Sequence, residues 1–415
     1  MWALAGVGLF VAFLLLLIWS SRRTLVRRVT PVALERIERL LPNLSALTGG
    51  PVTEGNRVEV IQDAAFFDAL LEDLRRAERT IHYETYIWWR GAICRELAEA
   101  FAERARAGVE VRLLLDAHGA RTMEAGVRRT MEETGCQVAW FHPFAVAHLG
   151  KVNSRDHRKI AVVDGRIAYF MGHGVAEEWA GGRPGERAWR DTAVRIQGPA
   201  VASAQTIFLK NWLKVNDELV IDARNFPALD RQGDARIHVA ASDPVGTYSE
   251  VEILLEVAIA SAQERLIIQN PYFVPAEPVL ELLAAAVDRG VDVRLMLPRE
   301  NDSLLVRHAS HRSYLHLLRA GVRLWEYLPT FAHQKVVVVD DVWSHVGSTN
   351  FDHRSLQINR EVSVGILDRG VAAELTAAFE EDLKSCEEVT LEGWASRSPL
   401  RGLGDRLAYL MREQI

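Results

Sequence analysis

Two stretches of the chain repeat one spacing of histidine, lysine and aspartate. They read His157-Arg-Lys-Ile-Ala-Val-Val-Asp164 and His333-Gln-Lys-Val-Val-Val-Val-Asp340. Residues i and i+2 of a β-strand face the same side, so in each stretch the histidine and the lysine point together. The apolar run after them predicts a buried strand that ends in a hairpin turn. Asp164 and Asp340 join the candidate catalytic set, and a structural role in the turn is the open alternative.

The repeated spacing is too specific to arise by chance. The chain has 13 histidines and only six lysines in 415 residues. For this composition the pattern is expected on the order of 0.01 times. Lys159 and Lys335 are two of those six lysines, and a compact ammonium suits a crowded phosphate better than a guanidinium. We therefore predict that His157 and His333 are catalytic and that the two lysines bind phosphate.

The segments around these stretches also repeat. A strand, a helix and a second strand are predicted in the same order twice, at 78–84, 93–106 and 109–116 and then at 264–269, 278–288 and 291–298. Arg79 and Arg265, Gly108 and Gly290, and the two histidines are each 176 to 186 positions apart. Alternating strands and helices at a constant offset predict an α/β fold built from two copies of one unit.

Domain boundaries follow from this repeat. The first domain is expected at 56–215 and the second at 235–385. A polar linker at 216–234 joins them, and a tail follows at 386–415.

The N-terminus has the composition of a membrane anchor. Residues 2–19 form an apolar run of 18, and four arginines follow between Arg22 and Arg28. A run of this length just spans a bilayer, and positive charge after it keeps the following residues in the cytoplasm. We predict a transmembrane anchor at 1–21, a basic linker at 22–55 and cytoplasmic catalytic domains, with a cleaved signal peptide or a buried helix as alternatives.

Composition limits the other classes of function. The net charge of -6 argues against a sequence-independent nucleic-acid binder, which usually has a basic face. The three cysteines are scattered and show no CxxC spacing, so neither a disulfide framework nor a zinc site is predicted. No cluster of carboxylates or of histidine and cysteine has metal-ligand spacing, and neither a metal nor another cofactor is expected.

The paired motif resembles the HKD signature of the phospholipase D superfamily. The resemblance extends from about residue 55 to residue 385. More narrowly, Tyr272–Pro275, Trp189–Thr192, Gly347–Ser355 and the anchor are similar to bacterial cardiolipin synthases. This resemblance implies two α/β/α domains packed with pseudo-twofold symmetry, preceded by a single membrane-spanning helix in the bacterial inner membrane.

The resemblance also implies further site residues. Ser348 and Asn350 would bind or orient the substrate phosphate, and the acidic Asp191 and Glu361 would each hold a catalytic imidazole. The first half departs from the family pattern, because 171–174 reads Met-Gly-His-Gly where 347–350 reads Gly-Ser-Thr-Asn. His173 either compensates for the missing amide or has a plain packing or surface role.

The reaction implied by the resemblance is phosphatidyl transfer between two phosphatidylglycerol molecules, with release of glycerol. By analogy His157 is the nucleophile that forms a phosphohistidine and His333 is the acid and base. The residues themselves leave the two roles open. The alternatives are a hydrolytic phospholipase D that makes phosphatidic acid, a phospholipase D-like nuclease, and a membrane scaffold without activity.

Overall fold

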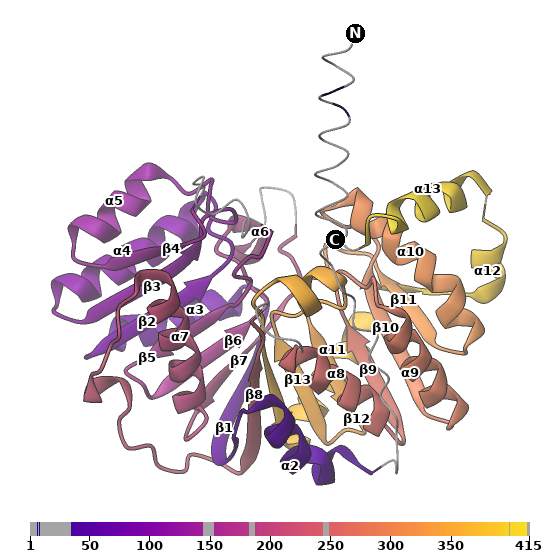
Figure 1. Ribbon diagram of the computed structural model, residues 1–415, viewed down its shortest axis with the longest axis horizontal. Coiled ribbons are helices and arrows are strands. Elements are labelled where there is room, and N and C mark those ends of the chain that lie inside the picture. The colour runs from indigo at the N-terminus through magenta and orange to yellow at the C-terminus, as the bar shows by residue number, and fades with distance from the viewer. Residues whose placement is uncertain are drawn as a thin grey trace.

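The computed structural model describes residues 6, 8, 35–143, 153–181, 187–243, 249–397 and 399–412. Within these ranges, 15 strands form one continuous mixed sheet (Figure 1). The strands of the first half are β1 Val52–Gln62, β2 Thr80–Thr85, β3 Glu110–Asp116, β4 Gln137–Phe141, β5 Ile160–Val163, β6 Ile167–Met171 and β7 Thr192–Gln197. Those of the second half are β8 Ala235–Ala241, β9 Arg265–Gln269, β10 Asp292–Pro298, β11 Arg323–Tyr327, β12 Val336–Val339, β13 Trp343–Gly347, β14 Val362–Leu367 and β15 Cys386–Val389.

The order of the strands repeats across the middle of the sheet. From the centre outward the first half runs β1-β7-β6-β5-β2-β3-β4, and the second runs β8-β14-β13-β12-β9-β10-β11 with β15 added at the edge. β1 and β8 pair antiparallel and join the halves. In each half three outer strands are parallel and the strands nearer the centre are antiparallel. The predicted α/β fold is therefore confirmed, and its repeat is visible in the topology.

Helices cover both faces of this sheet. The first half contains α2 Ile37–Thr48, α3 Ala65–Arg76, α4 Ala92–Arg106, α5 Ala125–Glu133, α6 Glu177–Ala180 and α7 Val201–Asn216. The second half contains α8 Glu250–Ser261, α9 Glu277–Asp288, α10 Leu304–Arg319, α11 Arg369–Leu383, α12 Leu391–Ala395 and α13 Pro399–Tyr409. Short helical turns lie at η2 Ala223–Asn225 and η3 Arg354–Ile358.

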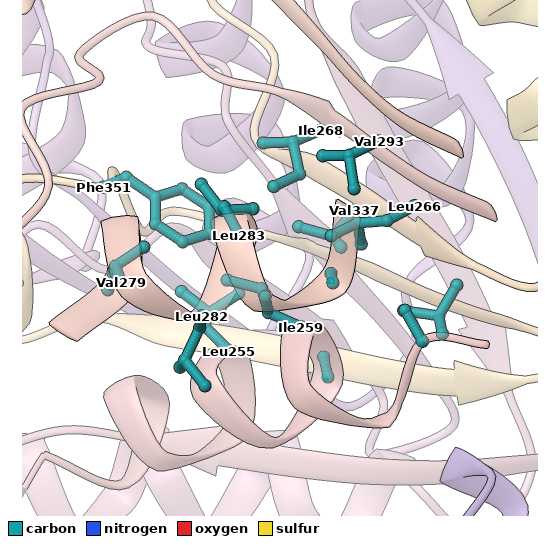
Figure 2. Packing of buried hydrophobic residues seen from close by; sticks show 14 of the residues in the cluster. Leu255, Ile259, Leu266, Ile268, Val279, Leu282, Leu283, Val293, Val337 and Phe351 are labelled. Atoms are coloured by element: carbon teal, nitrogen blue, oxygen red, sulfur yellow. The ribbon is translucent and has the colours of Figure 1, made fainter. Parts of the chain in front are cut away.

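Neighbouring residues of one strand reach different cores, because successive side chains of a strand point to opposite faces. On β9, Leu266 and Ile268 join the core under α8 and α9, whereas Ile267 joins the core on the other face. Figure 2 shows Leu255 and Ile259 of α8 and Leu282 and Leu283 of α9 packed over this strand. Burying each such side chain contributes about 1.5–3 kcal/mol. This layering fixes the strand ends at which the two motifs lie.

The predicted linker at 22–55 differs from what the structure shows for its described part. Residues 37–48 form α2, and β1 begins at Val52. Ile37, Leu41 and Leu44 recur at helical spacing and are buried against α8 of the second half. This apolar stripe makes the segment part of the fold.

The C-terminal residues also belong to the second half. β15 pairs antiparallel with β11 and widens the sheet. α13 packs on α10, where Asp405 accepts a hydrogen bond from His308 at 2.8 Å. The predicted tail at 386–415 is therefore folded onto the domain in its described part. Between α7, which ends at Asn216, and β8, the chain forms the short turn η2.

The predicted anchor cannot be compared with the structure. Residues 1–21 fall outside the described residues except for residues 6 and 8. In the described ranges, no helix has both the length and the apolar character needed to cross a bilayer.

Candidate active site

The two motifs lie at equivalent places, directly before the strands β5 and β12. The backbone N–H of His157 donates to the carbonyl of Arg360 at 2.9 Å, and that of His333 donates to the carbonyl of Arg190 at 2.7 Å. Each histidine is thus fixed to a segment of the opposite half. These crossed hydrogen bonds bring both motifs to the boundary between the halves.

The carboxylates cross the boundary in the same way. His157 Nδ1 lies 2.9 Å from Glu361 Oε1, and His333 Nδ1 lies 2.8 Å from Asp191 Oδ2. Both carboxylates are fully buried. A carboxylate on Nδ1 holds the proton there, which leaves Nε2 of the neutral ring with its lone pair toward the substrate. Each half therefore supplies one histidine and the carboxylate that orients the other.

Each carboxylate has a second donor, and the two donors differ. The Ser348 hydroxyl donates to Glu361, whereas Trp179 Nε1 donates to Asp191 at 2.8 Å. Gly172 takes the place of Ser348 in the first half, and a Cβ on it would lie 2.2 Å from Asp191 Oδ1. The indole of Trp179 supplies the hydrogen bond that the missing serine would make. Nothing in the spacing of the motifs points to Trp179.

Both lysines are buried beside their histidines. Lys159 Nζ donates to the carbonyl of His157 at 3.0 Å, and Lys335 Nζ lies 2.9 Å from His333 Nδ1 and 3.0 Å from its Nε2. Burial lowers the pKa of Lys159 to about 8 and that of Lys335 to about 7. Removing two ammonium groups from water disfavours their charged forms, and a bound phosphate would restore them.

The imidazoles and their carboxylates are shifted as well. Burial, followed by the charge of Lys335, lowers the pKa of His333 to about 3, and burial lowers the pKa of His157. Burial acts to raise the pKa of Asp191, but positive charges and hydrogen bonds from its neighbours keep it below its usual range. At neutral pH the ligand-free site therefore holds neutral imidazoles, which is the form that attacks phosphorus.

Asp164 and Asp340 do not line the cavity, and their hydrogen bonds stabilise the fold. Asp164 accepts from the backbone N–H groups of Glu78, Arg79 and Thr80 at 2.7–2.9 Å. Asp340 accepts from those of residues 263, 264 and 265 at 2.8–3.1 Å. Each aspartate therefore ties the turn after its motif strand to the start of the neighbouring strand, which favours the structural alternative.

A cavity of about 860 Å³ lies between the halves and contains both histidines. Its wall near His333 is aromatic, with ring centroids of Trp179, Trp189 and Tyr272 at 5.1–6.2 Å from the imidazole. Near His157, Tyr86 lies at 5.1 Å. Arginines also line the cavity at positions 90, 121, 155 and 354.

The remaining predicted residues fall into two groups. Asn350 lines the cavity and donates to Ser355 Oγ at 3.3 Å. His173 is fully buried, stacks on Phe66 with centroids 4.5 Å apart, and places Nε2 2.9 Å from the carbonyl of Asp63. His173 therefore has a packing role, and its side chain does not take the place of the amide that is missing at Gly174.

The described ranges hold one group of side chains spaced closely enough for a metal ion, formed by His308, His311 and Asp405. None of the three lines the cavity. His311 is 9% exposed, and Asp405 of α13 lies 3.6 Å from its Nδ1.

Two half-sites of buried histidine and lysine, completed by crossed carboxylates, define an enzyme of the phosphodiester-transferring class with a phospholipase D-like fold. The sequence model of one protein family, described as "Cardiolipin synthase, PLD-like domain", matches residues 70–178 and 255–383. The chain belongs to this family of cardiolipin synthases with phospholipase D-like domains. The family assignment from the sequence is thus confirmed.

Individual relatives agree with the family. The chain is 33% identical over 381 residues to cardiolipin synthase 2 of Staphylococcus epidermidis, covering 91% of this chain and 77% of that one. It is 34% identical over 383 residues to cardiolipin synthase A of Pseudomonas fluorescens, covering 90% and 77%. The fold is shared with phosphatidylserine synthase of Haemophilus influenzae, with a TM-score of 0.64 at 16% identity over 91% of this chain and 99% of that one.

Proposed function

We propose that this enzyme is a cardiolipin synthase that transfers a phosphatidyl group from one phosphatidylglycerol to another and releases glycerol. The observation that carries the proposal is the pair of crossed histidine–carboxylate contacts, at 2.9 and 2.8 Å, with a buried lysine beside each histidine and both histidines lining one cavity. Membership in the cardiolipin synthase family supports the lipid substrate.

The first step transfers the phosphatidyl group to the enzyme. His157 Nε2 attacks phosphorus, a P–N bond forms, and the P–O bond to glycerol breaks. His333, protonated as the substrate's negative charge enters and stabilised by Asp191, gives its proton to the glycerol oxygen. Lys159, Lys335 and Asn350 balance the charge on the other phosphate oxygens.

The second step reverses these roles. The hydroxyl of a second phosphatidylglycerol gives its proton to His333 and its oxygen attacks phosphorus. The P–N bond breaks, cardiolipin leaves, and His157 is regenerated. Water in place of the lipid hydroxyl would give phosphatidic acid, so the acceptor decides the product.

We place the enzyme in the bacterial inner membrane as a single-pass protein with cytoplasmic catalytic domains. The apolar run at 2–19 and the arginines that follow it support this location. The two halves are proposed to be duplicated phospholipase D-like domains related by a pseudo-twofold axis, as the repeated strand order suggests.

The test uses the purified full chain in detergent with phosphatidylglycerol and a chelator. Lipid products and glycerol are followed by mass spectrometry. We expect cardiolipin and glycerol, both lost in His157→Ala and His333→Ala and retained in the control His316→Ala, whose side chain is exposed on α10.

Two other outcomes would redirect the assignment. Phosphatidic acid as the sole product would make the protein a hydrolytic phospholipase D. No turnover of phospholipid by the wild-type chain would refute a lipid substrate and make nucleic acid the next substrate to test.

A further inference from the structure

Equivalent positions on the two sides of the cavity carry different side chains. Arg155 and Phe331 each lie two residues before a catalytic histidine, and their carbonyls accept from Arg360 N at 2.8 Å and from Arg190 N at 3.0 Å. The residue before each of those arginines also differs, being Asn359 on one side and Trp189 on the other. The same position of the fold is thus occupied by the cationic Arg155 before His157 and by the aromatic Phe331 before His333.

Three arginines of different elements line the cavity together with Tyr86, whose ring centroid lies 5.1 Å from that of His157. Arg155 precedes β5 and is 5% exposed, Arg354 opens η3 and is half-buried, and Arg121 follows β3 and is exposed. After burial, the charges of all three lower the pKa of His118, which lines the same wall.

Local contacts position these guanidinium groups. Arg354 donates to the side-chain oxygen of Asn153 at 3.0 Å and to its carbonyl at 2.7 Å. Arg121 Nη1 lies 3.1 Å from His118 Nε2, and Arg155 Nη1 lies 3.9 Å from Asp116 Oδ1. The wall is therefore built from side chains with defined partners.

The carboxyl groups nearest this wall compensate its charge only in part. Burial raises the pKa of Asp116 to about 6 and that of Asp352 to about 7. Asp116 also accepts from the backbone N–H groups of residues 118, 119 and 156. The cavity lining sets four arginines against the carboxyl groups of Glu178, Asp302 and Asp352, and this excess of cationic side chains favours an anion.

We propose that Arg121, Arg155 and Arg354 bind the phosphodiester of a second anionic phospholipid, the acceptor that attacks the phosphatidyl-enzyme. The inference rests on the proposed function, in which Lys159, Lys335 and Asn350 already serve the transferred phosphate. The acceptor carries its own phosphate one glycerol unit from its attacking hydroxyl. Guanidinium groups bind such phosphates through paired hydrogen bonds.

This subsite accounts for the choice of acceptor. Holding the second phosphate places the lipid hydroxyl at the phosphorus in preference to water or a small neutral alcohol. The bonds made and broken are those of the second step above, and the arginines exchange no proton. The arginines determine which acceptor binds.

The experiment is a competition between acceptors. The full-length enzyme in detergent receives phosphatidylglycerol with ethanol, and cardiolipin and phosphatidylethanol are measured together. We expect the ratio of cardiolipin to phosphatidylethanol to fall about tenfold in Arg354→Gln and further in the double variant with Arg121→Gln. The control Arg307→Gln removes one charge from α10 outside the cavity lining and should leave the ratio unchanged.

Each of the other outcomes would overturn either the subsite or the proposed function. A ratio that stays within about twofold of wild type in the double variant, while turnover continues, overturns the subsite. Equal loss of both products also overturns it, because the arginines would then serve the transferred phosphate. Arg121→Gln alters an exposed side chain, so folding is retained and an unchanged ratio counts against the proposal. A wild-type enzyme that makes no cardiolipin refutes the proposed function instead.

Discussion

The half-site at His157 and the half-site at His333 can be compared residue by residue, because the strand order repeats across the sheet. Both have a buried histidine and lysine and a carboxylate from the opposite half. They differ in the second donor to that carboxylate, Ser348 in one and Trp179 in the other. They also differ in the residue two positions before the histidine, which is Arg155 in one and Phe331 in the other. The repeated strand order thus carries the same reacting groups in two different surroundings.

The largest difference expected between the half-sites is in the covalent intermediate. His157→Ala and His333→Ala should each lower kcat by about 10³-fold or more, because each removes a reacting group. Acid-quenched wild-type enzyme mixed with phosphatidylglycerol should carry a phosphatidyl adduct on the peptide that contains His157. An adduct on His333 would reverse the assigned roles.

Replacing either crossed carboxylate should lower kcat nearly as much as replacing a histidine, and by the same factor in both half-sites. Asp191→Asn and Glu361→Gln should each lower kcat by about 10²-fold, because the amide cannot hold the same proton on Nδ1 or stabilise the imidazolium. Steady-state kinetics with phosphatidylglycerol checks this. Loss in only one of the two variants would contradict equivalent roles.

Replacing the second donors tests whether the indole and the hydroxyl are interchangeable. Trp179→Phe and Ser348→Ala should each lower kcat by about tenfold, since a hydrogen bond to a buried carboxylate contributes about 1.5–3 kcal/mol. Gly172→Ser makes the two halves alike at this one position, yet it should also lower activity because its Cβ would crowd Asp191. Higher activity in Gly172→Ser would refute this explanation of the asymmetry.

A pH series should separate phosphate binding from folding. Lys159 and Lys335 must be protonated to bind phosphate, so kcat/KM should fall as the pH rises through about 7 to 8. Unfolded lysine has a pKa of about 10.4, so between these values the unfolded chain binds more protons and stability rises with pH. The melting temperature should therefore rise while kcat/KM falls. Lys335→Met should flatten the rise, and an unchanged slope would argue against a depressed lysine pKa.

The smallest effect on activity is expected at the turns. Asp164→Ala and Asp340→Ala should each lower the free energy of unfolding by about 1–3 kcal/mol, because each leaves three backbone N–H groups without their acceptor. Denaturant titration measures this loss. The kcat of the folded variants should stay within about twofold of wild type, and a loss like that of the histidine variants would return these residues to the chemistry.

The sequence was informative where one residue type recurs at a fixed spacing. Alternation and the two motifs predicted the α/β repeat and placed His157 and His333 in one site. That Asp191 and Glu361 each contact the histidine of the opposite half could not be predicted, because this pairing depends on how the two halves of the sheet join. Trp179 could not be predicted, because it lies on α6, away from Gly172, which occupies the position equivalent to Ser348.

Segment boundaries show the same limit. The stripe of Ile37, Leu41 and Leu44 has helical spacing, but the arginines before it suggested a linker. Its place depends on the surface of α8, which lies over 200 residues later in the chain. Such long-range packing is not encoded in any local pattern.

The crossed contact between His157 and Glu361 has a consequence for biosynthesis. During translation the first histidine leaves the ribosome about 200 residues before the carboxylate that orients it, and domains fold as they emerge. A chain released early, or cut between the halves, would hold an imidazole without its proton acceptor. We therefore expect the nascent chain to reach full activity toward lipid only after Glu361 has been made.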